Sequence, residues 1–252
     1  MSAIAGLNAE RIKLCTIRSP LWSCLAAAVL GLGVAALQGS MAYDTADLSP
    51  ERAVIGVAVF AVPVLMILSA MTVTGEYRTG MIRTTFAATP NRSMVLVVKA
   101  VVAAVLSALC AGVLSVAAAV TARLLADPLL GAQLSLGASG VWRVSAALAL
   151  SAALAAVLGV AVGGLLRHTA GAVAVLLLWP LVVEPVLANL PDIGSEVGPY
   201  LPFVNVFVFT RVQWLYPGYA MPWGEVGSLI YFAAVAAVAF VAAVFVVNRR
   251  DA

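Results

Sequence analysis

The chain has 252 residues, of which 63% are apolar and only 10% are charged, and its formal net charge is +3. A soluble domain carries about 25% charged residues, so this composition excludes a protein that folds mainly in water and leaves no length for a large soluble catalytic domain. The small positive charge gives no support to nucleic-acid binding, since the placement of charge matters more than its sum in a membrane protein.

The N-terminal segment, residues 1–20, is polar and mixed in charge before the first apolar run. Leu7, Leu14, Ile17 and Leu21 recur at helical spacing, which predicts an amphipathic helix on the membrane surface. Arg11 and Arg18 lie close to the apolar side, where long side chains can extend to lipid phosphates. No convincing cleavage site follows the apolar run, so we expect an uncleaved first span.

Six apolar runs reach the length of about 20 residues that crosses a bilayer. The sequence therefore predicts an all-α integral membrane protein with six transmembrane helices and a single membrane domain over residues 1–252. The third run is longer than a crossing needs, which indicates tilt or an extension beyond the lipid. The predicted spans are Leu21–Leu37, Ala53–Thr74, Met94–Thr121, Val144–Leu166, Gly171–Leu190 and Val226–Val247.

The orientation follows from the placement of Lys and Arg, which cytoplasmic loops retain. A cytoplasmic N-terminus leaves only Arg52, Arg123, Arg143 and Arg211 facing outward. Both termini are therefore predicted to be cytoplasmic. The basic residues placed on the cytoplasmic side are Arg11, Lys13, Arg18, Arg78, Arg83, Arg92, Lys99, Arg167, Arg249 and Arg250.

Small residues are frequent in the spans and predict close helix packing. Gly159, Gly163 and Gly164 follow one another in the fourth span, and glycine lets two helix backbones approach closely. The three cysteines, Cys15, Cys24 and Cys110, lack the spacing of metal ligands and are predicted to be small buried residues without disulfides.

The segment between the second and third spans, residues 75–93, is compact, polar and charged on both sides. Thr89 before Pro90 is typical of an N-cap followed by proline at the first helical position, which predicts that the third helix begins there. The preceding dozen residues have room for one short surface helix. In it, Met81, Ile82 and Phe86 would pack, whereas Glu76, Arg78 and Arg83 would pair.

This segment resembles the coupling loop of ABC-2 type transporter permeases. The pattern is Glu, aromatic, Arg, any residue, Gly and an aliphatic pair, followed downstream by Ala-Thr-Pro-x-Arg. The resemblance extends to the layout of the whole chain: an N-terminal interfacial helix, six spans and a coupling helix after the second span. The residues that carry the resemblance are Glu76, Tyr77, Arg78, Gly80, Met81, Ile82, Ala88, Thr89, Pro90 and Arg92.

The resemblance implies the membrane subunit of a bacterial ATP-binding cassette exporter, located in the plasma membrane. Such a permease pairs with a second permease subunit, as a homodimer or heterodimer, and with two ATPase subunits that hold the ATP and Mg²⁺. The predicted substrate is an amphiphile, a drug, peptide or lipid-like molecule, exported by alternating access. The residues expected to contact the ATPase are Glu76, Tyr77, Arg78, Gly80, Met81, Ile82 and Arg83.

The fifth span and the outer segment 191–225 contain the least regular part of the sequence. Trp179-Pro180 and Glu184-Pro185 are predicted to interrupt the fifth helix near its outer end. The run Phe203–Phe209 is too short to cross a membrane, so short re-entrant or interfacial helices are expected. A carboxylate at this depth normally faces a cavity or a partner. Glu184 and Asn205 are therefore predicted to lie along the substrate route, unless Glu184 faces the outer water.

Catalytic chemistry finds no support in the sequence. The single histidine, His168, follows Arg167 in a tight loop and is read as a membrane anchor. The chain has no histidine pair for zinc and no glycine-rich Lys-Ser/Thr loop for ATP phosphates. We therefore expect no enzyme and no cofactor on this chain.

Two other classes remain open on the sequence alone. The first is a membrane scaffold or assembly protein that does not transport and only recruits a cytoplasmic partner. The second is an uncoupled channel or a secondary carrier, a class that usually shows midplane ionisable residues and internal repeats. Neither feature is clear in this sequence.

Overall fold

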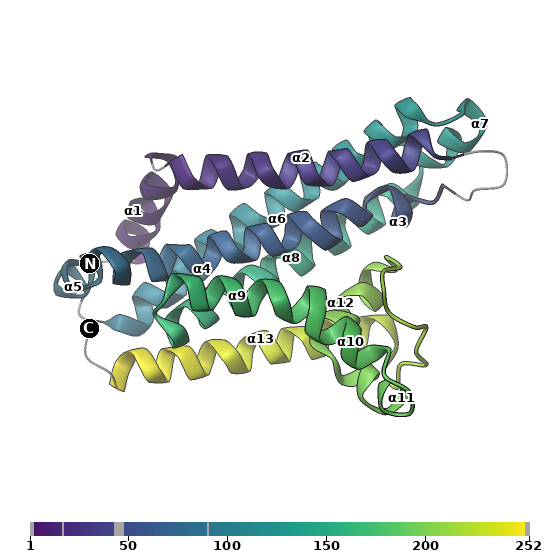
Figure 1. Cartoon of the computed structure of the whole chain (residues 1–252). Helices are drawn as coiled ribbons and strands as arrows, with labels where there is room; N and C mark the ends of the chain where they lie inside the picture. The colour runs from purple at the N-terminus through teal and green to yellow at the C-terminus, as the bar shows by residue number, and fades with distance from the viewer. Residues whose placement is uncertain (1–2, 17, 43–47, 90, 250–252) are drawn as a thin grey trace.

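The computed structural model describes residues 3–16, 18–42, 48–89 and 91–249; most of these residues are helical and none of them forms a strand. Within these described ranges, six helices are long and apolar enough to cross a membrane, which confirms the predicted number and supports a multi-pass membrane protein. They lie side by side, and the start of α1 and the end of α13 are at the same end of the bundle (Figure 1). The six are α2 Arg18–Ser40, η1 with α4 Val57–Thr79, α6 Arg92–Leu125, α8 Ser139–Leu166, α9 with η3 and α10 Thr169–Ala188, and α13 Gly224–Arg249.

Short helices cover both ends of the bundle (Figure 1). At the end shared by the start of α1 and the end of α13, α1 (Ala3–Thr16) runs across the bundle and α5 (Met81–Ala88) joins α4 to α6. In α1, Leu7 is partly buried, whereas Ile17 and the side chain of Leu14 lie outside the described residues. The opposite end carries α3 Pro50–Ala53, α7 Pro128–Gly131, η2 Ala132–Leu134, α11 Ile193–Val197, η4 Gly198–Tyr200 and α12 Pro202–Thr210.

The boundaries around α5 differ from the prediction. The second long helix continues to Thr79, so residues 75–79 of the predicted loop are helical. The third begins at Arg92, where Asn91 is the N-cap and its Oδ1 accepts a hydrogen bond from the Met94 N–H at 3.0 Å. The prediction that Thr89 caps this helix is therefore wrong, and Pro90 lies outside the described residues.

The prolines of the fifth long helix widen it instead of breaking it. Residues Trp179–Val183 form one turn of π-helix, η3, and α10 continues from Glu184 to Ala188. A proline lacks the N–H of the regular ladder and its ring crowds the preceding turn, and a wider turn accommodates both effects. A second π-helical turn, η1 (Val57–Ala61), precedes Pro63 in the same way.

Close packing of α4 against α8 rests on two of the three glycines that the sequence singled out. A Cβ placed at Gly159 would overlap the carbonyl oxygen of Met66, and one at Gly163 would lie 2.8 Å from the carbonyl oxygen of Ala70. At Gly164, by contrast, a Cβ would make ordinary contacts. The close-packing prediction is therefore confirmed at Gly159 and Gly163.

The Gly159→Ala variant is expected to lose about 1–3 kcal/mol of stability, because an overpacked interface must shift a backbone. The Gly33→Ala variant is the matched control, since a Cβ at Gly33 meets no atom within 4 Å. Alanine is the better helix former, so this control should be neutral or slightly more stable. Thermal unfolding of both purified variants in one detergent measures the difference; equal melting temperatures would contradict the packing assignment.

The helix pair α2 and α6 brings two of the three cysteines together. Cys24 and Cys110 are free thiols whose Sγ atoms lie 3.7 Å apart. The side chain of Cys15 lies outside the described residues. For Cys24 and Cys110, the thiols occupy a helix interface as small, partly buried side chains.

Candidate functional site

A sharp elbow connects two of the long helices at the end of the bundle that carries α1. Gly80 ends α4 with φ 72°, a left-handed conformation that glycine adopts without steric cost. Its N–H donates to the Tyr77 carbonyl at 3.3 Å, and its own carbonyl accepts from the Arg83 N–H at 3.3 Å. The elbow therefore turns the chain from α4 directly into α5.

The helix α5 has one packed face and one open face. Ile82 and Phe86 are buried against Val73, Val95 and Leu96 of α4 and α6. The guanidinium of Arg92 lies 5.2 Å from the centre of the Phe86 ring. The open face, defined here by the exposed residues at the end of α4 and along α5, consists of Arg78, Thr79, Gly80, Met81, Arg83, Thr84, Ala87 and Ala88.

Directly beneath this elbow, four charged side chains form a cluster in which all but one are buried. The Lys99 ammonium donates to Glu76 Oε1 at 2.7 Å, to Glu10 Oε1 at 3.0 Å and to the Thr72 carbonyl at 3.0 Å. The Lys13 ammonium donates to the same two oxygens, at 2.7 Å from Glu76 and 2.9 Å from Glu10. We name Glu10, Lys13, Glu76 and Lys99 the tetrad.

The tetrad balances two positive and two negative charges, of which only that of Lys13 is partly exposed. Lys99 is only 2% exposed and Glu76 only 7%, and a buried charge is tolerated only when it is paired and hydrogen-bonded. The Thr85 hydroxyl completes the set by donating to Glu76 Oε2 at 3.2 Å. Through these bonds α1, α4, α5 and α6 are held together at one point.

Lys13 is the cation that α1 contributes to the tetrad, outside the long helices. Burial lowers the pKa of its ammonium, but the hydrogen bonds and charges of Glu76 and Glu10 outweigh burial, so the pKa is raised above its ordinary value. Lys13 therefore stays protonated at neutral pH and keeps α1 attached to α4.

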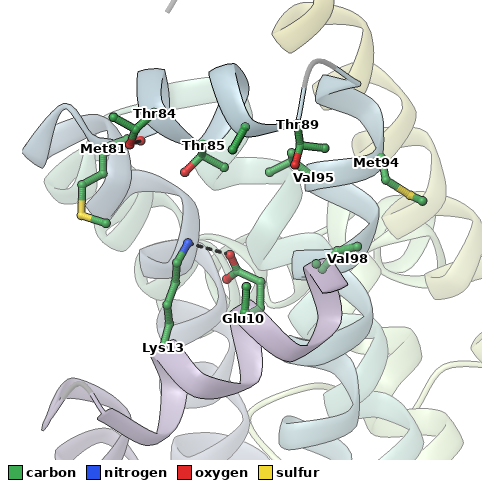
Figure 2. A pocket seen from close by; sticks show the side chains of 12 residues that line it. Glu10, Lys13, Met81, Thr84, Thr85, Thr89, Met94, Val95 and Val98 are labelled. Atoms are coloured by element: carbon green, nitrogen blue, oxygen red, sulfur yellow. Dashed lines mark hydrogen bonds and ion pairs between the residues drawn. The ribbon is translucent and has the colours of Figure 1, made fainter. Parts of the chain in front are cut away.

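A pocket of about 280 Å³ opens beside the tetrad, between α1, α5 and the start of α6. In Figure 2, Glu10 and Lys13 form its floor on α1, Thr84 and Thr85 face it from α5, and Val98 closes it from α6. Its lining is mostly apolar. Among the described residues, no group of three or more His, Cys, Asp or Glu side chains could hold a metal ion.

The structure separates the residues that the sequence predicted for the ATPase contact into two sets. Arg78, Gly80, Met81 and Arg83 lie on the open face. The others point inward: Glu76 belongs to the tetrad, Ile82 is 3% exposed, and Tyr77 lies under the Arg167 guanidinium at 4.9 Å.

At the opposite end, Glu184 is fully buried at the N-terminus of α12. Its carboxylate accepts hydrogen bonds from the Phe203 N–H at 2.8 Å, the Val204 N–H at 3.1 Å and the Trp179 indole N–H at 2.8 Å. A negative charge is favoured at a helix N-terminus. Because Glu184 is fully buried, exposure to outer water is ruled out, and the predicted partner is the α12 backbone.

Asn205 is also fully buried and fully engaged. Its amide nitrogen donates to the Pro199 and Leu201 carbonyls, both at 2.9 Å, and its carbonyl accepts from the Trp223 indole at 2.9 Å. Both residues thus hold α12 and the neighbouring segments in place, while their contact with a transported substrate stays a prediction.

The sequence reasoning missed three of the four tetrad members: Glu10, Lys13 and Lys99. Lys13 and Lys99 were read as ordinary cytoplasmic charges. The available signal was Lys99 itself, a single cation inside an apolar run of the third span, since intramembrane charges normally have a named partner.

The two ends of the bundle thus differ in how accessible their polar residues are to solvent. At the α12 end, Glu184 and Asn205 are buried in hydrogen bonds to the backbone and indoles. At the other end, the tetrad supports an elbow whose open face is solvent-exposed.

When the sequence is compared with known protein families and with curated proteins, no family model and no curated protein matches it.

Proposed function

We propose that this chain is the membrane subunit of an ATP-binding cassette exporter, and that the open face of α5 receives the ATPase subunit. ATP and Mg²⁺ would bind on that partner and not on this chain. The tetrad end would face the cytoplasm of a bacterial cell, in line with the gathering of basic residues at that end. In this proposal α1 is interfacial, α5 is the coupling helix, and a second permease subunit completes the membrane part.

The observation that carries the proposal is the combination of an exposed face and a rigid base in one short helix. Arg78, Met81 and Arg83 are exposed on the elbow, while Ile82 and Phe86 are packed into the bundle. A partner that binds this face would therefore pull on α4 and α6 together, because the tetrad and the apolar contacts resist bending of the elbow alone.

The energy for transport would enter through this contact. A ligand shifts a conformational equilibrium only by its difference in affinity for the two states. Closure of two ATPase subunits around ATP would bring two elbows together and favour the outward-facing state, and hydrolysis would restore the inward-facing one. The proposed substrate is an amphiphile, a drug, peptide or lipid-like molecule.

A direct test is to purify the complex from its native membrane through a tag on this chain. The proposal predicts that an ATPase subunit copurifies and is labelled by a photoreactive ATP analogue. The Met81→Asp/Arg83→Glu double variant should lose that subunit, because it reverses the charge and polarity of the open face and replaces no member of the tetrad. Arg123→Glu, an exposed arginine at the other end of α6, is the matched control.

Three outcomes contradict the proposal. They are copurification that survives the double variant, loss of the partner in the control, and a copurified partner that binds no nucleotide. The last would favour the scaffold alternative. A Glu76 substitution is a poor choice for this experiment, because it also breaks the tetrad and hence the fold.

A further inference from the structure

A second pocket lies at the same end of the bundle, between α4 and α9. Its volume is about 630 Å³, and α4 and α9 lie side by side (Figure 1). The turn from α8 into α9 supplies three consecutive lining residues, Arg167, His168 and Thr169. The lining residues are Tyr77, Arg78, Arg167, His168, Thr169, Ala170, Val173 and Ala174.

The polar part of this pocket is suited to an anion. Arg78 and Arg167 place two guanidinium groups in its wall, and none of the described lining residues is acidic. The Nδ1 atom of His168 accepts a hydrogen bond from the Gly171 N–H at 3.2 Å. A neutral histidine has one donor nitrogen and one acceptor nitrogen, so Nε2 carries the proton and serves as a further donor on an exposed side chain.

Two hydroxyl groups in the same lining have no hydrogen-bond partner among the residues that the structure describes. These are Tyr77 Oη and Thr169 Oγ1, both buried atoms. A buried polar atom without a partner is costly and calls for an explanation, such as a bound group. Both hydroxyls can donate to an oxyanion, and phosphate oxygens accept strong hydrogen bonds from guanidinium groups and hydroxyls.

The remaining wall is apolar and continues along the bundle. Ala170, Val173 and Ala174 line the pocket, and Leu177 and Leu178 extend the apolar surface as exposed side chains, 37% and 51% exposed. A polar site for an oxyanion followed by an apolar track on a membrane-spanning helix matches the two parts of a phospholipid.

We propose that the pocket between α4 and α9 binds the phosphate of an anionic phospholipid, with an acyl chain along α9. The lipid belongs to the leaflet that meets the α1 end of the bundle. Arg78 belongs both to this pocket and to the open face, but the site does not depend on the proposed transport function, because its chemistry comes only from the lining residues. It links α4, next to the elbow, to the annular lipid.

The test is native mass spectrometry of the full chain in detergent, titrated with phosphatidylglycerol and, separately, with phosphatidylcholine of the same acyl chains. The chain should retain phosphatidylglycerol about tenfold more tightly, because the two guanidinium groups favour net negative charge. The Arg78→Ala/His168→Ala variant should bind phosphatidylglycerol about tenfold more weakly, and Thr169→Val should weaken it severalfold through one lost hydrogen bond.

The matched controls are Arg83→Ala and Thr84→Val, an exposed arginine and an exposed threonine of α5 outside this pocket. They should bind like the unmodified chain. Equal retention of both lipids, or equal weakening by the controls, would overturn the proposal. Displacement of the lipid by inorganic phosphate alone would also overturn it, by showing a site for free phosphate. Thr169→Val preserves side-chain volume, so it keeps the test informative should the double variant fail to fold.

Discussion

Replacing Lys99 with methionine is expected to destabilise the protein by about 3–5 kcal/mol, the usual cost of breaking a buried ion pair from one side. Methionine keeps the length and apolar stem of lysine. It removes the ammonium that joins Glu10, Glu76 and the Thr72 carbonyl. Lys13 alone would then face two carboxylates, and a net negative charge would remain buried.

The double variant Lys99→Met/Glu10→Gln restores neutrality, since Lys13 and Glu76 still pair at 2.7 Å. It should therefore recover part of the lost stability. The Arg211→Met variant is the control, because its partner Glu225 is 43% exposed and exposed pairs contribute about 0–1 kcal/mol. Denaturation of the purified variants in mixed micelles measures all three. A Lys99→Met loss as small as that of the control would refute the structural role of the tetrad.

The second large effect is expected at Glu184. Leucine at this position would leave the Phe203, Val204 and Trp179 N–H groups without their acceptor. Because each buried donor left without a partner is costly, we expect a loss of about 2–5 kcal/mol in the free energy of unfolding. Glu184→Gln keeps one acceptor oxygen and should lose less.

Glu196→Leu, at an exposed position of α11, is the control for Glu184→Leu and should stay within about 0.5 kcal/mol of the unmodified chain. Thermal melting in detergent, combined with a transport measurement, distinguishes a structural role of Glu184 as the cap of α12 from a role in substrate contact. A Glu184→Leu protein that melts normally but loses transport would show that the residue acts on a substrate and that its cap on α12 is dispensable.

The number of long helices could be predicted because each one contains a long, mostly apolar run in the sequence. The close approach of α4 and α8 was also predictable, since the glycines that permit it, Gly159 and Gly163, lie a helical turn apart. Both features are local in sequence.

Features that depend on partners distant in sequence could not be predicted in the same way. The extension of α4 to Thr79 includes Glu76, which is stable inside the bundle only because Lys13 and Lys99, 63 and 23 residues away, neutralise it. Read alone, Glu76 is a polar loop residue.

The outer end shows the same limitation. The sequence predicts that Glu184 needs a partner. That partner is the backbone of α12, 19 residues further along. Backbone N–H groups are common to nearly all residues, so the sequence does not indicate which of them binds Glu184. The prolines near Glu184 were expected to interrupt the helix, whereas the helix continues through Pro180 as a π-helical turn.

The most direct measurement for the central claim is photo-cross-linking from the open face of α5. A photoreactive amino acid in place of Met81, which is 48% exposed, is activated in native membranes, and the adduct is identified by mass spectrometry. The account predicts one protein adduct, with a subunit that binds and hydrolyses ATP. An adduct with a protein that binds no nucleotide, or with lipid alone, would contradict it.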